Sequence, residues 1–254
     1  MSDTRNRFRE RLLSGETLIG LWCSLGSPMV AEILSLADYD WILLDTEHSP
    51  NEPRDLLTQL QALQGCASEP IVRPAWNDPV LIKRVMDVGV KSLIVPFVQT
   101  KEEAEAAVRA SRYPPDGIRG IAAGTRASRY GTDEAYWRTI NGQVAVVVQV
   151  ESQQTLDNLD AICEVPEVDC LFVGPNDLAA SLGLIRQIDA RPVQEGIARV
   201  VETCRAKGKA AGILATSAEE TRRYLDMGFT LVGAGADIAV LRNGAVALRE
   251  QFRQ

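Results

Sequence analysis

Eight short, continuously apolar runs, separated by amphipathic stretches, constrain the fold of this chain more than any other feature. Because the runs do not alternate apolar with polar residues, they predict parallel strands that are buried on both faces. Eight such strands alternating with helices in 254 residues are typical of a (β/α)8 TIM barrel. An open doubly wound sheet is the main alternative, because it shows the same alternation. The predicted strands are Leu18–Ser24, Trp41–Glu47, Pro70–Ala75, Ser92–Val98, Val144–Glu151, Cys170–Gly174, Ala211–Ala215 and Leu231–Gly235.

Helical periodicity fills the segments between these runs, and Pro28, Pro53 and Pro79 stand at or just before three helix starts. Proline is tolerated there because the first amide groups of a helix have no partner within it. No linker or break in composition divides the chain, so we expect a single domain over residues 1–254. The predicted helices are an additional one at Thr4–Leu13, then Met29–Ala37, Arg54–Leu63, Val80–Val88, Glu102–Arg112, Thr155–Glu164, Val193–Lys207, Ala218–Met227 and Ile238–Phe252.

Residues 113–142 form the longest irregular stretch, and a connection of that length is unusual unless it is functional or mobile. Gly233 and Gly235 end the eighth run, where we expect them to serve a tight strand-to-helix turn. A phosphate cradle is the alternative at that position of a barrel. Asp237 is expected to cap the last helix.

The charge balance and the cysteines exclude several classes of protein. With 27 Lys+Arg against 34 Asp+Glu, the net charge is −7, which argues against sequence-independent nucleic-acid binding. No apolar run approaches the length of a membrane span, and the charged amino terminus lacks an apolar signal core, so we expect a cytoplasmic protein. None of the five cysteines forms a Cys-x-x-Cys pair, which favours reduced thiols over disulfides or a zinc site.

Polar side chains gather where four of the predicted strands end. His48 follows the second strand, Arg73 lies near the end of the third, Glu151 ends the fifth and Asp177 follows the sixth. In a barrel, the carboxyl ends of the strands meet at one face, which carries the chemistry. Because a charge inside an apolar strand is costly unless it is paired or bound to an ion, the four strand ends indicate one shared site.

Glu151 and Asp177 follow neighbouring strands, and one histidine in the whole chain excludes a histidine-rich metal site. Two carboxylates with a nearby amide form an oxygen-only set that suits magnesium or manganese, with water and substrate as further ligands. Pairing of each carboxylate with an arginine is the alternative. None of the five lysines is placed at a carboxyl strand end, so a Schiff base is not expected and a metal would have to polarise a carbonyl substrate.

His48, beside Asp45 and Glu47, is a candidate general base, although a lone histidine often has no chemical role. Arg73 needs an anion, because a buried guanidinium is costly without one. That anion is either a bound carboxylate or a reaction oxyanion, or else Asp45 or Glu47 across the strand pair.

Five segments together resemble the HpcH/HpaI aldolase family, which comprises class II, metal-dependent pyruvate aldolases on a (β/α)8 barrel. They occur in the same order and span nearly the whole chain. The segments are Trp41–Asn51, Val72–Pro79, Arg112–Gly120, Val148–Glu151 and Phe172–Leu178.

The resemblance implies a metal site and a pyruvate site that share residues. Glu151 and Asp177 would bind the divalent cation, which would be magnesium, manganese or cobalt. Gln149 and the backbone from Gly174 to Asp177, including Asn176, would hold pyruvate, which chelates the metal through its carboxylate and keto oxygens.

The resemblance also implies roles for residues beyond the metal site. Arg73 would stabilise the enolate oxygen, His48 would act as base through a water, and Asp87 would raise the basicity of that histidine. Arg126 would receive the distal carboxylate of the aldehyde, and Leu214 would line an apolar pocket. We expect the long loop that carries Arg126 to close over the aldehyde.

The expected activity is reversible cleavage of a 4-hydroxy-2-oxo acid into pyruvate and an aldehyde. Two substrates compete: 2-dehydro-3-deoxyglucarate, which the sequence slightly favours, and 4-hydroxy-2-oxoheptanedioate. A citryl- or malyl-type CoA-ester lyase on the same barrel and a non-catalytic barrel that binds oxo acids are the alternatives. Members of the family form hexamers built from dimers that exchange their C-terminal helices, so the resemblance implies a homo-oligomer, with the helix Ile238–Phe252 as the exchanged element.

Overall fold

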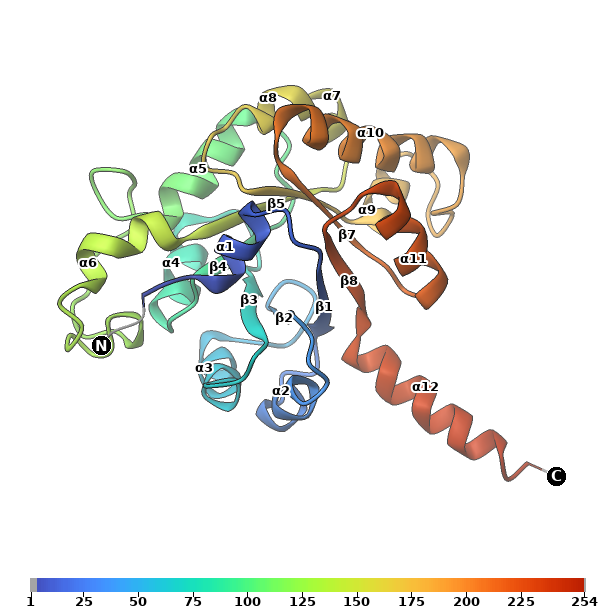
Figure 1. Ribbon diagram of the computed structural model, residues 1–254, viewed down its shortest axis with the longest axis horizontal. Helices are drawn as coiled ribbons and strands as arrows, with labels where there is room; N and C mark the ends of the chain where they lie inside the picture. Colours follow the sequence, from blue (N-terminus) through green and yellow to red (C-terminus); the bar gives the residue numbers. More distant parts are fainter. Residues whose placement is uncertain (1–3, 254) are drawn as a thin grey trace.

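The structure is a computed structural model that describes residues 4–253, so positions 1–3 and 254 of the predicted domain lie outside it. Eight parallel strands close into a barrel in chain order, with β1 paired to both β2 and β8 (Figure 1). This closure confirms the TIM barrel and excludes the open sheet. The strands are β1 (Leu18–Cys23), β2 (Trp41–Asp45), β3 (Glu69–Arg73), β4 (Ser92–Val95), β5 (Ala145–Val150), β6 (Cys170–Val173), β7 (Ala210–Leu214) and β8 (Leu231–Ala236).

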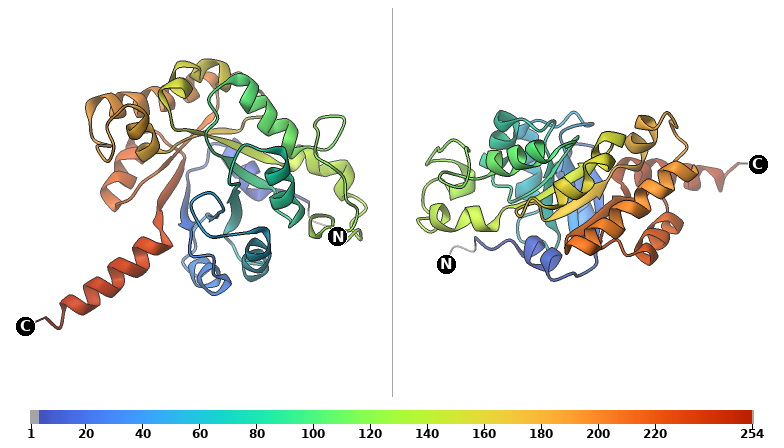
Figure 2. Two further views of the ribbon diagram at one scale, coloured as in Figure 1. Left: turned by 180° about the vertical axis from the view of Figure 1, so that it is seen from behind. Right: turned by 90° about the horizontal axis from the view of Figure 1, so that it is seen from above.

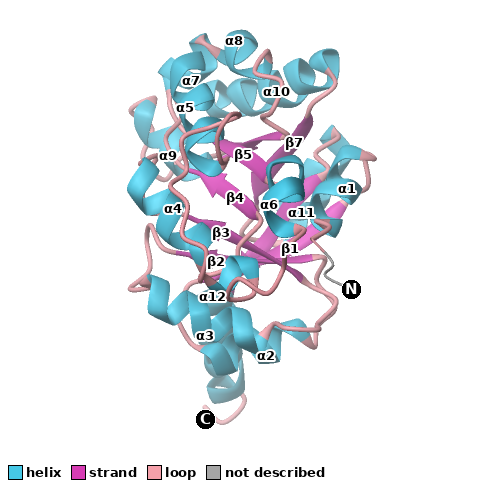
Figure 3. Ribbon diagram, turned by 90° about the vertical axis from the view of Figure 1, so that its left-hand side faces the viewer, coloured by secondary structure: helices cyan, strands magenta, loops and turns pink. Residues whose placement is uncertain are grey.

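Helices surround the barrel, as Figure 3 shows by the cyan ribbons outside the magenta strands. The predicted helix at residues 155–164 is in fact two short helices that break at Asn158, and the helix that begins at Pro175 was not predicted. The helices are α1 (Arg7–Leu13), α2 (Pro28–Ser35), α3 (Pro53–Ala62), α4 (Pro79–Asp87), α5 (Lys101–Ser111), η1 (Arg126–Ser128), α6 (Tyr136–Thr139), η2 (Ile140–Gln143), α7 (Gln153–Asp157), α8 (Leu159–Cys163), α9 (Pro175–Ser181), α10 (Arg191–Lys207), α11 (Ala218–Met227) and α12 (Asp237–Glu250).

Three aromatic rings fill the barrel interior, and glycines on neighbouring strands make room for them. Trp22, Trp41 and Phe172 pack together, with ring centroids 5.4–6.4 Å apart. A Cβ atom at Gly20 would lie 2.0 Å from the Trp41 ring, and one at Gly233 would lie 2.9 Å from the Trp22 ring. The expectation that Gly233 serves a turn is therefore wrong, because its missing side chain is needed for interior packing.

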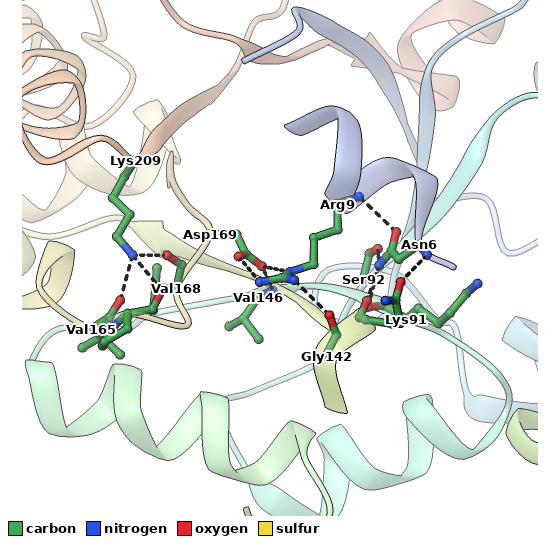
Figure 4. Close-up of polar contacts among 12 residues, drawn as sticks. Asn6, Arg9, Lys91, Ser92, Gly142, Val146, Val165, Val168, Asp169 and Lys209 are labelled. Atoms are coloured by element: carbon green, nitrogen blue, oxygen red, sulfur yellow. Dashed lines mark hydrogen bonds and ion pairs between the residues drawn. The ribbon is translucent and has the colours of Figure 1, made fainter. Parts of the chain in front are cut away.

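Helix α1 closes the amino end of the barrel through buried polar contacts (Figure 4). Arg9 donates to both carboxylate oxygens of Asp169 at 2.9 and 3.0 Å, and Asp169 also accepts from the backbone N–H of Val146. The Asn6 amide donates to Ser92 Oγ at 2.9 Å. These contacts stabilise the amino end of the barrel. They serve the fold and not the reaction, because a barrel carries its catalytic residues at the carboxyl ends of the strands.

Residues 112–144 join α5 to β5 and therefore run along the amino end of the barrel. The segment contains η1, α6 and η2, and η1 packs against α4. Because helices run antiparallel to the strands they follow, every helix-to-strand connection of a barrel returns to this end. The loop therefore does not reach the carboxyl face of its own barrel, and its closure over the aldehyde stays a prediction.

Helix α12 leaves the barrel instead of packing on it, and ends far from the other helices in both views of Figure 2. Its main contacts are with β1 and β8 at its base. Asp237 is its first residue rather than its cap, and the buried carboxylate accepts from the N–H groups of Ser24 and Leu25 at 2.9–3.0 Å. Among the residues described, no helix is both long and apolar enough to cross a membrane.

Candidate active site

Seven of the residues predicted for the site line one cleft of about 290 Å³ at the carboxyl ends of the strands. They come from four strands or the turns that follow them, as the barrel topology requires. Trp22, Phe172 and Pro175 complete the lining. The seven predicted residues are Arg73, Gln149, Glu151, Gly174, Asn176, Asp177 and Leu214.

The Arg73 side chain lines this cleft, and two carboxylates bind its guanidinium. Strands β2 and β3 pair Asp45 with Arg73, and the guanidinium donates to both Asp45 oxygens at 2.9 and 2.6 Å. Glu47 forms a further ion pair with Arg73 at 2.9 Å. Such a bidentate fork fixes the plane of the guanidinium, so its cleft-facing side is already oriented for an anion.

Glu151 is almost fully buried, and each of its oxygens has one donor. Gln149 Nε2 donates to Oε1 at 2.7 Å, and the backbone N–H of Phe97 donates to Oε2 at 3.0 Å. Burial raises the pKa of Glu151 to about 7, and the nearby carboxylates of Glu47 and Asp177 add to the increase. The Phe97 amide and the Arg73 guanidinium act against this increase in pKa, and a bound cation would favour the charged form of the carboxylate further.

The residues around Glu151 fit a divalent cation that is completed by substrate and water. Gln149 Oε1 is buried without a hydrogen-bond partner, and a Cβ at Gly174 would lie 2.7 Å from Glu151 Oε1, so glycine keeps that side open. In the part of the chain that the structure describes, no group of three or more His, Cys, Asp or Glu side chains could hold a metal. Glu151 and Asp177 would supply two oxygen ligands to such a cation, and the remaining positions would be open to small molecules.

His48 lies on the turn after β2, where its side chain is 67% exposed and 3.8 Å from Glu47. It does not line the cleft itself. Burial raises the pKa of Glu47, and His48 and Arg73 act against that increase. The histidine is thus near the cleft and free to reach a molecule that extends beyond it.

Asp87 and Arg126, whose roles were implied by the resemblance, do not lie with these residues in this chain. Asp87 is the last residue of α4 and pairs with Arg119 at 2.7 Å. Arg126 donates to the carbonyl of Val88 at 2.7 Å and lines a separate cavity of about 1210 Å³. Both lie at the amino end of the barrel, because a helix that follows a strand carries the chain back to that end.

Several residues of the site were not singled out from the sequence. Trp22 and Phe172, which form the apolar wall of the cleft, are two of them. The pairing of Arg73 with Asp45, by contrast, was one of the alternatives left open by the sequence, and the structure confirms it. The inward spacing of Trp22 on β1, two residues from Gly20, was a usable signal. The contact of the Phe97 amide with Glu151 had no sequence signal, because any residue except proline has that N–H.

Known proteins resemble this chain over nearly its whole length. The family model for HpcH/HpaI aldolase/citrate lyase matches residues 18–244. Two proteins named 5-keto-4-deoxy-D-glucarate aldolase, from Shigella boydii serotype 18 and Escherichia coli strain K12 / DH10B, are 44% identical over 98% of this chain and 97% of their own.

A solved structure shows the same similarity in three dimensions. The crystal structure of an HpcH/HpaI aldolase/citrate lyase family protein from Burkholderia cenocepacia J2315 has a TM-score of 0.95 and 42% identity, and the match covers 98% of this chain and 100% of that one. The family predicted from five sequence segments is confirmed, and with it the prediction of a carbon–carbon lyase. The chain belongs to the HpcH/HpaI aldolase/citrate lyase family.

Proposed function

We propose that this protein is a metal-dependent aldolase that reversibly cleaves a 4-hydroxy-2-oxo diacid into pyruvate and an aldehyde. The observation that carries the proposal is the meeting of Glu151, Asp177, Gln149 and Arg73 in one cleft. The relatives named 5-keto-4-deoxy-D-glucarate aldolase favour the sugar diacid over 4-hydroxy-2-oxoheptanedioate. Counted from its keto end, that compound is itself a 2-oxo acid with a 4-hydroxyl group.

A divalent cation at Glu151 and Asp177, magnesium or manganese with cobalt as a further option, would act as a Lewis acid on the substrate carbonyl. Gln149 and the backbone from Gly174 to Asn176 bind the oxo-acid end. Trp22, Phe172 and Leu214 keep water from that end, because they form the apolar wall of the cleft.

His48 transfers a proton, and Arg73 stabilises the negative charge that forms. His48 removes the proton from the 4-hydroxyl, directly or through a water, and the C3–C4 bond then breaks. The pyruvate enolate left by that step carries its charge on the oxygen that faces the Arg73 guanidinium. The proton taken up by His48 then returns, directly or through a water, to the C3 carbon of the enolate and gives pyruvate. Asp45 and Glu47 keep the guanidinium in place while the substrate charge changes.

We further propose that the enzyme is a cytoplasmic homo-oligomer, and the expected form is a hexamer built from dimers that exchange helices. The support from this chain is α12, on which Val240, Leu241, Val246 and Leu248 are 53–64% exposed. A helix that exposes this much apolar surface is typical of an element that packs against another copy.

Asp87 and Arg126 take part in this proposal only between subunits. Because they lie at the opposite end of the barrel from His48, they act on the substrate only if a neighbouring copy presents them to the cleft. Co-expression of His48→Ala chains with Asp87→Ala chains tests this arrangement. Mixed oligomers that regain turnover support it, and mixed oligomers as inactive as either parent contradict it.

The decisive experiment for the function is aldol synthesis from pyruvate with a panel of aldehydes, with and without a distal carboxylate, in the presence of Mn²⁺. Wild-type protein should form products, and Glu151→Gln should form none. Glu164→Gln is a matched control, because Glu164 is an exposed carboxylate paired with Lys207 away from the cleft. Cleavage of malyl-CoA without aldol synthesis would instead indicate a CoA-ester lyase, and pyruvate binding without turnover would indicate a binding protein.

A further inference from the structure

The loop after β4 presents an unusual feature beside the site. Phe97 has a φ of 54°, in the left-handed region that side chains other than glycine adopt rarely. From this position its backbone N–H donates to Glu151 Oε2 at 3.0 Å. A non-glycine residue keeps such a backbone conformation only where its surroundings impose it.

The surroundings of Phe97 include a second exposed aromatic residue. Its ring stacks on Trp76, which follows β3, with ring centroids 5.6 Å apart and planes 25° from parallel. Trp76 is 51% exposed and Phe97 is 36% exposed, so neither ring is fixed by burial in the core. The stack on Trp76 is therefore an aromatic contact that restrains the Phe97 side chain at this surface.

The rest of the loop is bonded to the segment that carries Glu151. Thr155 Oγ1 donates to the carbonyl of Val98 at 3.1 Å, and the Gln99 side chain donates to Ser152 Oγ at 2.9 Å. Asn158 donates to the carbonyl of Gln99 at 2.9 Å. Together with the Phe97 amide, these bonds align the two loops along their length.

We propose that Phe97 and Trp76 are positioning residues for the metal site, and that their stack holds the Phe97 amide on Glu151. The inference rests on the proposed function, because it takes Glu151 as a metal ligand. Each carboxylate oxygen accepts two hydrogen bonds or ligands. With one donor on each oxygen, Glu151 keeps one free lone-pair direction per oxygen, and the amide of Phe97 fixes which way these point.

The test is a Mn²⁺ titration of the metal-free full-length protein. Binding is measured by calorimetry or by the electron paramagnetic resonance signal of free Mn²⁺. Trp76→Ala and Phe97→Ala should weaken Mn²⁺ binding about tenfold or more, as loss of a hydrogen bond to a charged group would. Phe97→Tyr, which keeps the stack, should bind like wild type. Phe97→Gly should lie between wild type and Phe97→Ala, because glycine keeps the N–H and adopts positive φ without strain.

A second readout separates positioning from general loosening. At saturating Mn²⁺ the kcat of Trp76→Ala should return to within about threefold of wild type, because the pair acts through metal binding. Leu13→Ala is the matched control: it removes an exposed apolar side chain at the amino end of the barrel, and it should change neither quantity. Thermal melting of each variant reports whether it folds.

Glu151→Gln separates failure of this inference from failure of the function. If Glu151→Gln loses Mn²⁺ binding while Trp76→Ala and Phe97→Ala bind like wild type, only the positioning role is overturned. If Glu151→Gln binds Mn²⁺ like wild type, the metal assignment itself fails, and the positioning role fails with it.

Discussion

Replacement of Arg73 by lysine tests whether the planar guanidinium is needed for turnover. The substitution keeps a positive charge in the cleft but removes the fork that bonds both Asp45 oxygens and pairs with Glu47. Lysine offers a single point of charge, so it cannot serve two carboxylates and a substrate oxyanion in one fixed geometry. The change therefore acts on both stability and catalysis, and the two effects can be estimated separately.

The structure sets the expected size of each effect. Loss of one hydrogen bond between charged groups costs about 1.5–3 kcal/mol of unfolding free energy. For a chain of this length, that loss lowers the Tm by roughly 3–12 °C. Removal of one oriented donor to a developing oxyanion lowers kcat by about 10²–10³, and we expect the same for Arg73→Lys.

Pyruvate release, followed through lactate dehydrogenase and the oxidation of NADH, gives kcat and KM for the variant. Arg9→Lys is the matched control, because Arg9 forms the same kind of bidentate pair with Asp169 at the opposite end of the barrel. It should lose stability and keep kcat. If Arg73→Lys also keeps kcat within about threefold of wild type, Arg73 is only a structural partner of Asp45, and the proposed role is refuted.

Four further outcomes are expected. EDTA should abolish cleavage, and Mn²⁺ or Mg²⁺ should restore it; activity that resists the chelator would contradict the metal site. Because the pKa of Glu151 is raised to about 7, Mn²⁺ must displace a proton at lower pH. The apparent Kd should weaken about tenfold per pH unit below 7 and level off above it, whereas a constant Kd from pH 5.5 to 7.5 would argue against this. Borohydride with pyruvate should trap no adduct, and modification of any lysine would revive the Schiff-base route. Truncation before Asp237 should reduce the oligomer size in light scattering; an unchanged mass would show that α12 is not the exchanged element.

The barrel could be predicted from the sequence because its strands are buried on both faces. All eight predicted strands occur, and the start of β2 at Trp41 and of β4 at Ser92 is as predicted. Seven strand ends were predicted too late, as at Glu47 and Val98, because apolar or site residues continue past the last ladder pair, and the end of β8 was predicted one residue too early. Helix α9 was missed because its first residues, from Pro175 to Asp177, were interpreted only as a site motif.

The barrel topology could be used to locate those site residues that lie at strand ends. Residues at strand ends were placed correctly, because parallel strands bring those ends together. The same rule also places residues 113–142, a helix-to-strand connection, at the amino end of the barrel. The roles of Asp87 and Arg126 rest on the resemblance, and the fold of one chain gives no information on what a neighbouring copy contributes.

The charges around the cleft indicate the order in which metal and substrate bind, which the net charge of the chain does not. Four carboxylates, those of Asp45, Glu47, Glu151 and Asp177, lie at or just behind the cleft, against one arginine. The two functions considered for Arg73, partner of Asp45 and acceptor of an anion, are thus not alternatives, because the carboxylates orient the face that meets the substrate. Without a further cation the cleft would repel an oxo acid. A divalent ion at Glu151 and Asp177 would offset the charge of these two carboxylates and offer a positive centre to the substrate oxygens, so we expect the metal to bind before, or together with, the anionic substrate.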